Sequence, residues 1–255
     1  MNFLIGLAAG LFGGLVGLGG GVVMIPLMVG ILKLEQIKAH GNSLAAIVCS
    51  GLVGAATYAW QGSVDVIAAV LLASAAVFTV RAGARYAGSL PEWKLKKAFG
   101  AFLLLVTLMM LIKPYLPHLA TPATGWLKIL TLVFAGAFTG FLSGMMGVGG
   151  GTIMVPAMVL LTGMPQYVAQ GSSLLAMVPV GVTGSYTHWR LGSLDSKLLT
   201  GLIPGIIAGS ILGGLLAHSI PEGMLRLLFA IVLAWSGVKY LRTRAVKPEE
   251  EEEGV

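Results

Sequence analysis

The sequence predicts an all-α polytopic membrane protein of two inverted repeats, each with a glycine-tipped re-entrant hairpin and three transmembrane helices. Composition is the first reason: 56% of the 255 residues are hydrophobic and only 10% are charged, whereas soluble domains carry about a quarter charged residues. A duplication of the chain and the distribution of its basic residues are the other two. Together they indicate both the membrane and the arrangement of the chain within it.

The apolar residues form several runs of roughly 17 to 25 residues, the length that crosses a bilayer core as an α-helix. Alternating strand patterns are absent, so helices are favoured over a barrel. Lys and Arg cluster between these runs, so the net charge of +6 reflects membrane topology rather than nucleic-acid binding. The single cysteine, Cys49, excludes an internal disulfide and a cysteine-rich metal site, and no cofactor is expected.

The chain matches itself at an offset of 130 residues without a gap. The segment GLFGGLVGLGGGVVMIPLMV (10–29) aligns with GFLSGMMGVGGGTIMVPAMV (140–159), and ten of the twenty positions are identical. The match continues from GSVD (62–65) to GSLD (192–195). Internal repeats of this kind are typical of secondary transporters, in which two halves enclose a central site.

Each repeat is expected to contain one interrupted apolar segment, the hairpin, followed by three plain spans. In the first repeat, residues 1–115, these segments are 2–32, 41–60, 64–83 and 97–113. An extracytoplasmic linker at 116–125 leads to the second repeat, residues 126–243, with segments 126–162, 170–190, 196–217 and 224–240. Residues 244–255 form an acidic tail that we expect to be disordered.

Asp65 and Asp195 occupy equivalent positions at the starts of two spans, each two residues after a serine. A carboxylate there accepts hydrogen bonds from the first free amides of a helix. We therefore interpret both residues as N-caps, with a functional carboxylate as the alternative.

The two interrupted segments either cross the membrane once or enter and leave on the same side as hairpins. If both cross, the sixteen Lys and Arg residues divide eight against eight. If both are hairpins, the second repeat inverts, and thirteen lie on one side with only Lys113, Lys128 and Arg226 on the other. The positive-inside rule favours the hairpins and places both termini in the cytoplasm, in a cytoplasmic (inner) membrane.

The hairpin tips, GLGGG (17–21) and GVGGG (147–151), should approach each other near the bilayer centre. A turn at that depth leaves backbone groups that lipid cannot satisfy and that a ligand can use. Glycine permits positive φ and close approach of a solute, and the helices that restart after each tip direct their N-terminal amides at it, which favours an anion. The alternative is that the glycines serve helix packing alone. The predicted anion-binding residues at the tips are Gly17, Gly19, Gly20, Gly21, Gly147, Gly149, Gly150, Gly151 and Thr152.

In three recurring motifs the chain resembles members of the sulfite exporter TauE/SafE family, also called the toluene sulfonate uptake permease family. The motifs are the paired G-x-GGG segments each followed by a proline, the stretches GNSL (41–44) and GSSL (171–174), and the G-S-x-D turns. The resemblance extends over nearly the whole chain up to the acidic tail. It implies a transporter of sulfur-containing oxyanions or organosulfonates such as sulfite or sulfoacetate, in a family whose members differ in substrate and in direction.

Side chains that donate hydrogen bonds recur where the first plain span of each repeat begins. Several neutral donors together with two helix N-termini would hold a small anion and still release it. The predicted residues are Asn42, Ser43, Gln170, Ser172 and Ser173. The alternative for the serines at 43 and 173 is a bond to a carbonyl of their own helix. His40 is either a titrating residue that couples transport to protons or an interface histidine in a loop at the cytoplasmic end.

The predicted function is alternating-access transport of a small anion held between the two tips, with protons or another ion as possible coupling partners. A passive anion channel is the alternative, because glycine-lined re-entrant loops also build pores. An enzyme is not expected, since the sequence contains no HExxH motif, no G-x-S-x-G motif and no buried acid pair.

Overall fold

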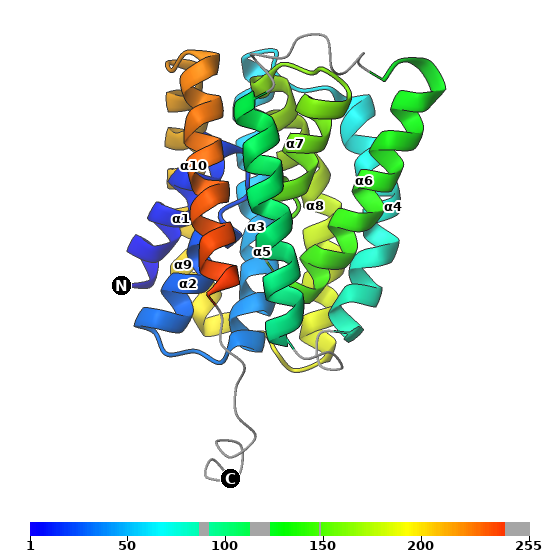
Figure 1. The fold of residues 1–255 in the computed structure, drawn as a ribbon. Coiled ribbons are helices and arrows are strands. Elements are labelled where there is room, and N and C mark those ends of the chain that lie inside the picture. The colour runs from blue at the N-terminus through cyan, green and yellow to red at the C-terminus, as the bar shows by residue number, and fades with distance from the viewer. Residues whose placement is uncertain (87–91, 113–122, 148, 243–255) are drawn as a thin grey trace.

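A computed structural model describes residues 1–86, 92–112, 123–147 and 149–242, which form a bundle of α-helices (Figure 1). The helices of this described part are, in order, α1 Asn2–Val16, α2 Gly21–Ile31, α3 Gln36–Trp60, α4 Val66–Tyr86, α5 Glu92–Ile112, α6 Gly125–Met146, α7 Gly151–Leu161, α8 Gln166–Arg190, α9 Ser196–His218 and α10 Glu222–Leu241. A helix lies at each position where a plain span is predicted, and α3 and α8 begin several residues earlier than expected. The tail 244–255 and most of the linker 116–125 lie outside the described residues.

Five helices of the described part are long and apolar enough to cross a membrane, namely α3, α4, α6, α9 and α10. The protein is therefore an all-helical, multi-pass membrane protein, as its composition predicts. Helix α6 is the first arm of the second hairpin, and its 22 residues are twice the 11 residues of α7, the second arm. At 1.5 Å per residue it measures about 33 Å, and it runs obliquely through the bundle in Figure 1.

The first arm of each hairpin packs against a helix of the other repeat. Three glycines of α1 lie so close to the backbone of α9 that a Cβ atom would not fit, and three glycines of α6 lie in the same way against α4. The pairs are Gly6 with Leu202, Gly10 with Ile206 and Gly14 with Ser210, and correspondingly Gly136 with Leu72, Gly140 with Ala76 and Gly144 with Val80. Each contact in one set has an equivalent in the other set, in which the glycine and its partner are each shifted by 130 positions. Gly10 and Gly14 therefore allow close packing of α1 against α9.

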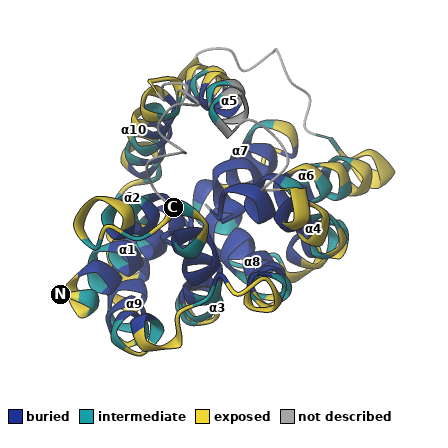
Figure 2. Ribbon diagram, turned by 90° about the horizontal axis from the view of Figure 1, so that it is seen from below, coloured by how far each residue is buried: buried dark blue, intermediate teal, exposed yellow. Residues whose placement is uncertain are grey.

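Helices α3 and α8 cross each other in antiparallel orientation. Gly51 of α3 lies against the carbonyl oxygen of Leu174, and Gly181 of α8 lies against that of Leu44. The ends pair in the same way, Gly41 with Ser193 and Gly171 with Ser63. Because equivalent helices run in opposite directions, the contacts define a pseudo-two-fold axis perpendicular to them. In Figure 2, α3, α8 and α7 are among the helices with the most buried residues.

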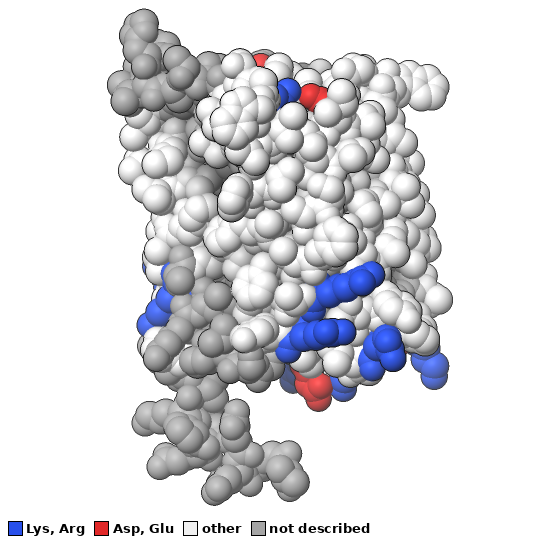
Figure 3. All heavy atoms as spheres, turned by 90° about the vertical axis from the view of Figure 1, so that its right-hand side faces the viewer, with Lys and Arg blue, Asp and Glu red and all other residues white. Residues whose placement is uncertain are grey.

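The basic residues gather at one end of the bundle (Figure 3). Arg81 and Arg85 lie in the last turns of α4, and Arg190 ends α8. A Cβ atom on Gly184 of α8 would lie 3.2 Å from the side chain of Val80 of α4, so these two helices end at the same end of the molecule. Two hairpins require this arrangement, whereas two single crossings would separate Arg190 from the arginines of α4.

Candidate functional site

Both hairpin tips turn through glycines in the left-handed region of the backbone. The φ values are 74°, 71° and 85° at Gly17, Gly19 and Gly20, and 62° and 82° at Gly147 and Gly149. Residues with a Cβ atom rarely adopt such angles. Gly150 differs, because its φ is −79° and its backbone conformation is open to any residue. A larger side chain is excluded there by lack of space, since a Cβ atom would lie 2.7 Å from Thr139 Cγ2.

The two tips touch each other. Gly151, the first residue of α7, lies against the carbonyl oxygen of Gly17 and the Cα atom of Leu18. A Cβ atom on Gly149 would lie 3.1 Å from the carbonyl oxygen of Leu18. The structure therefore brings together tip residues that are about 130 positions apart in the sequence, and in this conformation they are in direct contact.

The contact lies halfway along the central helices. The side chains of Ile47 and Met177, which are equivalent residues of α3 and α8, both approach the Cβ positions of Gly19 and Gly149 at 3.0–3.5 Å. Ile47 and Met177 each stand near the middle of a 25-residue helix. A helix of that length measures about 37 Å, so the tips meet at roughly half the depth of the bundle.

Ser43 and Ser173 fasten each tip to the other repeat. The Ser43 hydroxyl donates a 2.8 Å hydrogen bond to the carbonyl oxygen of Gly147, and Ser173 donates an equivalent 2.8 Å bond to Gly17. Both serines are fully buried. Bonding to a carbonyl of their own helix, the alternative for these serines, is therefore not observed. Both hydroxyls instead donate to carbonyl groups of the turns, which lipid could not satisfy.

Gln170 and His40 are equivalent residues that lie against opposite tips. A Cβ atom on Gly17 would lie 2.6 Å from Gln170 Cβ, and one on Gly147 would lie 2.6 Å from His40 Cα. The Oε1 atom of Gln170 accepts a 3.0 Å hydrogen bond from Tyr58, while its Nε2 atom is buried without a hydrogen-bond partner. His40 is 5% exposed within α3, so the prediction of a loop histidine is wrong.

Asn42 and Ser172 are directed at turns rather than at the tips. The Oδ1 atom of Asn42 accepts a 3.1 Å hydrogen bond from the amide of Asp195, and the Ser172 hydroxyl accepts a 2.7 Å bond from the amide of Asp65. These bonds hold the starts of α9 and α4. The sequence offers no signal for this use, since the partners are more than 100 residues away.

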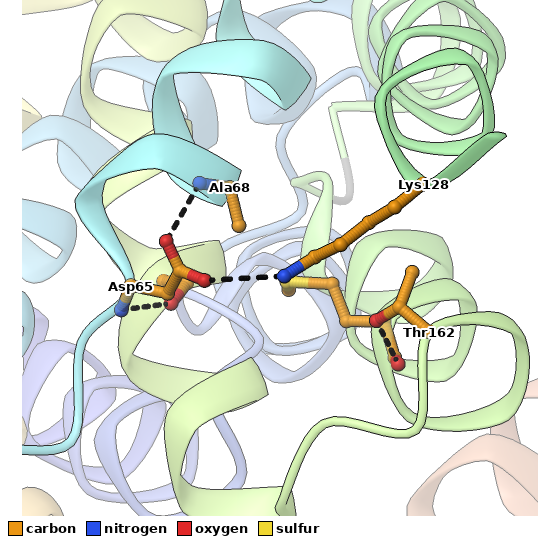
Figure 4. A network of polar contacts seen from close by, with 6 residues as sticks. Asp65, Ala68, Lys128 and Thr162 are labelled. Carbon is orange, nitrogen blue, oxygen red and sulfur yellow. Dashed lines mark hydrogen bonds and ion pairs between the residues drawn. The ribbon is translucent and has the colours of Figure 1, made fainter. Parts of the chain in front are cut away.

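The two aspartates cap helices, as predicted. Asp65 Oδ1 accepts a 2.9 Å hydrogen bond from the amide of Ala68, and Asp195 Oδ1 accepts bonds from the amides of Lys197 and Leu198. Asp65 also forms an ion pair of 3.6 Å with Lys128 of α6 (Figure 4). That pair joins the second hairpin to the start of α4.

A cavity of about 290 Å³, here called the vestibule, lies between α2, α3, α6 and α10. Its lining includes His40 and Met146, which adjoin the second tip, and Gln36, Trp235 and Lys239. The Nζ atom of Lys239 lies 5.2 Å from the centre of the Trp235 ring. The sequence gives no signal for the residues of α10 in this cavity, because their approach to His40 and Met146 depends on tertiary packing.

Comparison with known proteins agrees with this architecture. The family model described as "Sulfite exporter TauE/SafE" matches residues 2–241. The "Probable membrane transporter protein YunE" of Bacillus subtilis (strain 168) is 28% identical over 230 residues, covering 80% of this chain and 84% of that protein. A "Probable membrane transporter protein" of Xylella fastidiosa (strain 9a5c) is 30% identical over 234 residues, covering 90% and 88%.

The "Probable membrane transporter protein MJ0441" of Methanocaldococcus jannaschii is 26% identical over 168 residues, and the match covers 62% of this chain and 60% of that protein. No solved structure matches the chain. The family match spans both hairpins and all the helices described above. The chain therefore belongs to the sulfite exporter TauE/SafE family of membrane transporters.

Proposed function

We propose that the protein is a secondary transporter that moves a small sulfur-containing anion, such as sulfite, sulfoacetate or another organosulfonate, across the cytoplasmic membrane. The observation that best supports this proposal is that the two glycine tips meet halfway along α3 and α8. Each tip is hydrogen-bonded to the opposite repeat through Ser43 or Ser173. Such a contact between two halves at mid-depth is where inverted-repeat transporters bind their solutes. The family supplies the class of substrate.

Neutral groups recognise the anion in this proposal. Helices α2 and α7 begin at Gly21 and Gly151, and the first amides of a helix have no partner within it. Their partial positive charge attracts an anion without the tight binding of a buried cation. Gln170 adds a buried amide group, Nε2, that has no partner in this conformation.

The vestibule is the cytoplasmic entrance. Its lining includes Lys239, which lies in the last turn of α10. The positive charge of the Lys and Arg side chains that gather at one end of the bundle (Figure 3) raises the local concentration of anions. His40 lines the vestibule next to Gly147. It is the candidate for coupling transport to protons, because imidazole is the side chain whose ordinary pKa lies nearest neutrality.

Alternating access then arises from movement of the two hairpins relative to the central helices. The tips touch in this conformation, so an anion enters between them only when they part. In the proposed topology both termini are cytoplasmic, the first hairpin enters from the cytoplasm and the second enters from outside.

The experiment is anion flux in proteoliposomes that contain the purified protein. A carrier gives saturable uptake of a radiolabelled sulfonate or sulfite that responds to an imposed pH or ion gradient. Very high conductance that ignores those gradients would instead establish the passive channel. Uptake equal to that of protein-free liposomes, for sulfite, thiosulfate, sulfoacetate, taurine and sulfate alike, would refute the proposed substrate class.

A further inference from the structure

A second polar cluster lies beside the second hairpin tip, between α5, α6 and α7. It surrounds a narrow enclosed gap lined by Phe99, Thr139, Leu142, Ser143, Met146, Gly149, Thr152 and Ile153. Three of these side chains carry hydroxyl groups, and all three are at least 97% buried. In this conformation the gap has no room for a water molecule. The hydroxyl groups are therefore shielded from solvent.

The hydroxyls of Thr139 and Ser143 have no hydrogen-bond partner. That is unusual, because a hydroxyl within a helix ordinarily bonds to the carbonyl four residues before it. Thr131 on the same helix does so, donating to Leu127 at 2.8 Å, as does Thr107 on α5. A buried polar group left without a partner calls for an explanation, and a ligand that binds in another conformation is one.

The cluster belongs to one repeat only. The residues equivalent to Thr139, Ser143 and Thr152 in the first repeat are Ala9, Gly13 and Val22, none of which has a side-chain donor. The remaining architecture of the tips is duplicated, including the serine bonds to the turns. Packing requirements shared by both hairpins therefore do not account for three hydroxyls on one of them.

The same gap adjoins the start of α7, an 11-residue helix that begins at Gly151. Its first amides have no partner within the helix, and the positive end of its dipole favours a negative charge. Hydroxyl donors next to a helix N-terminus suit the oxygens of an anion, which can accept several hydrogen bonds.

We propose that Thr139, Ser143 and Thr152, with the N-terminus of α7, form a subsite for the oxyanion group of the substrate. This inference rests on the function proposed above and deepens it, because it places the negatively charged oxygens on the side of the second hairpin. The substituent that distinguishes one sulfonate from another then points toward the tip contact and the first hairpin.

Met146 separates this subsite from the vestibule, since its side chain lines both. A methionine side chain is unbranched and flexible and rotates at little cost. Phe99 of α5 closes the gap from another side. Rotation of these two side chains opens a path from the cytoplasmic entrance to the hydroxyl groups, and the described conformation is the closed one.

The test uses Thr139→Val, Ser143→Ala and the double variant, each purified in detergent and reconstituted. Thr131→Val is the matched control, because it removes from the same helix the hydroxyl of a half-buried residue that is already bonded to Leu127. Two quantities are measured: the melting temperature with and without sulfite, thiosulfate, sulfoacetate, taurine or sulfate, and the KM for uptake of whichever anion stabilises the wild type.

Without an anion, Thr139→Val and Ser143→Ala should melt at or above the wild-type temperature, because the hydroxyls they remove have no partner to lose. The KM of each variant should rise at least tenfold, and that of the double variant further, while Thr131→Val keeps the wild-type KM. A double variant with a KM within twofold of wild type overturns the subsite and leaves the proposed function standing. A wild type that binds and transports none of the five anions overturns both.

Discussion

The hydroxyl of Ser43 donates a 2.8 Å hydrogen bond to the carbonyl oxygen of Gly147, so a central helix of one repeat holds the turning point of the other repeat's hairpin. Ser43→Ala leaves that carbonyl buried without a partner. We expect the free energy of unfolding to fall by about 1–3 kcal/mol and uptake to fall with it. Denaturation in mixed micelles together with flux assays measures both.

The equivalent variant Ser173→Ala should have an effect of similar size, because the Ser173 bond to Gly17 has the same length. Ser185→Ala is the control: that serine is half-buried on the same helix as Ser173, and its hydroxyl bonds to Val182 of its own helix. If Ser43→Ala, Ser173→Ala and Ser185→Ala are equally stable and active, the cross-repeat bonds do not hold the tips.

Gly19→Ala tests the tip geometry with the least disturbance of packing. Its φ of 71° disfavours any residue with a Cβ atom by about 1–2 kcal/mol, and the neighbours of that atom are the flexible side chains of Met177 and Ile47. We expect folded protein at near wild-type yield with transport abolished, and the same result for Gly149→Ala. Gly223→Ala, where an added Cβ meets no atom within 4 Å, should transport normally. Normal uptake by Gly19→Ala would remove the tip from the transport site.

Cysteine labelling tests the membrane topology. In a Cys49→Ala background, Pro165→Cys and Gln61→Cys place exposed thiols where α8 begins and α3 ends, which is one end of the antiparallel helix pair. Leu191→Cys places an exposed thiol at the other end, next to Arg190. An impermeant reagent applied outside intact cells should modify the first two and spare the third. Labelling of Leu191→Cys alone would invert the orientation. Labelling of Pro165→Cys and Gln61→Cys from opposite sides would contradict the hairpins.

Substitutions at the aspartate caps distinguish the contribution of a helix cap to stability from that of the ion pair between Asp65 and Lys128. Asp195→Ala removes a cap and should lower the free energy of unfolding by about 0.5–2 kcal/mol. Lys128→Met removes only a partly exposed ion pair and should cost less than about 1 kcal/mol. Asp65→Ala loses both interactions and should be the least stable of the three in thermal melts. Equal melting temperatures for Asp65→Ala and Lys128→Met would mean that the cap contributes nothing.

Much of the architecture can be read from the sequence, because the membrane restricts it so strongly. Apolar runs of helical length, the offset of 130 residues and the basic residues together predict helices, repeats and hairpins. The oblique course of α6 through the bundle (Figure 1) is not among the features that the sequence predicts. Nothing in hydropathy reports tilt.

The site was predicted less completely, because its contacts join distant parts of the chain. The tip glycines and the serines at 43 and 173 stand out as repeated motifs, and the structure brings them together. The partners of Asn42 and Ser172, the lysine and tryptophan of the vestibule, and the unpaired hydroxyls of Thr139 and Ser143 depend on tertiary packing. The hydroxyl pair is also absent from the first repeat, so a search for duplication passes over it.

Because the first arm of each hairpin packs against a helix of the other repeat, assembly of the bundle depends on the order in which its helices are synthesised. Gly6 of α1 packs against Leu202 of α9, so this glycine face of α1 has no permanent partner until the chain has been synthesised past that residue. Until α9 is inserted, that face contacts lipid or the insertion machinery. The first repeat alone does not supply the helix that covers this face of α1, and chains truncated before α9 should be targets for membrane proteases.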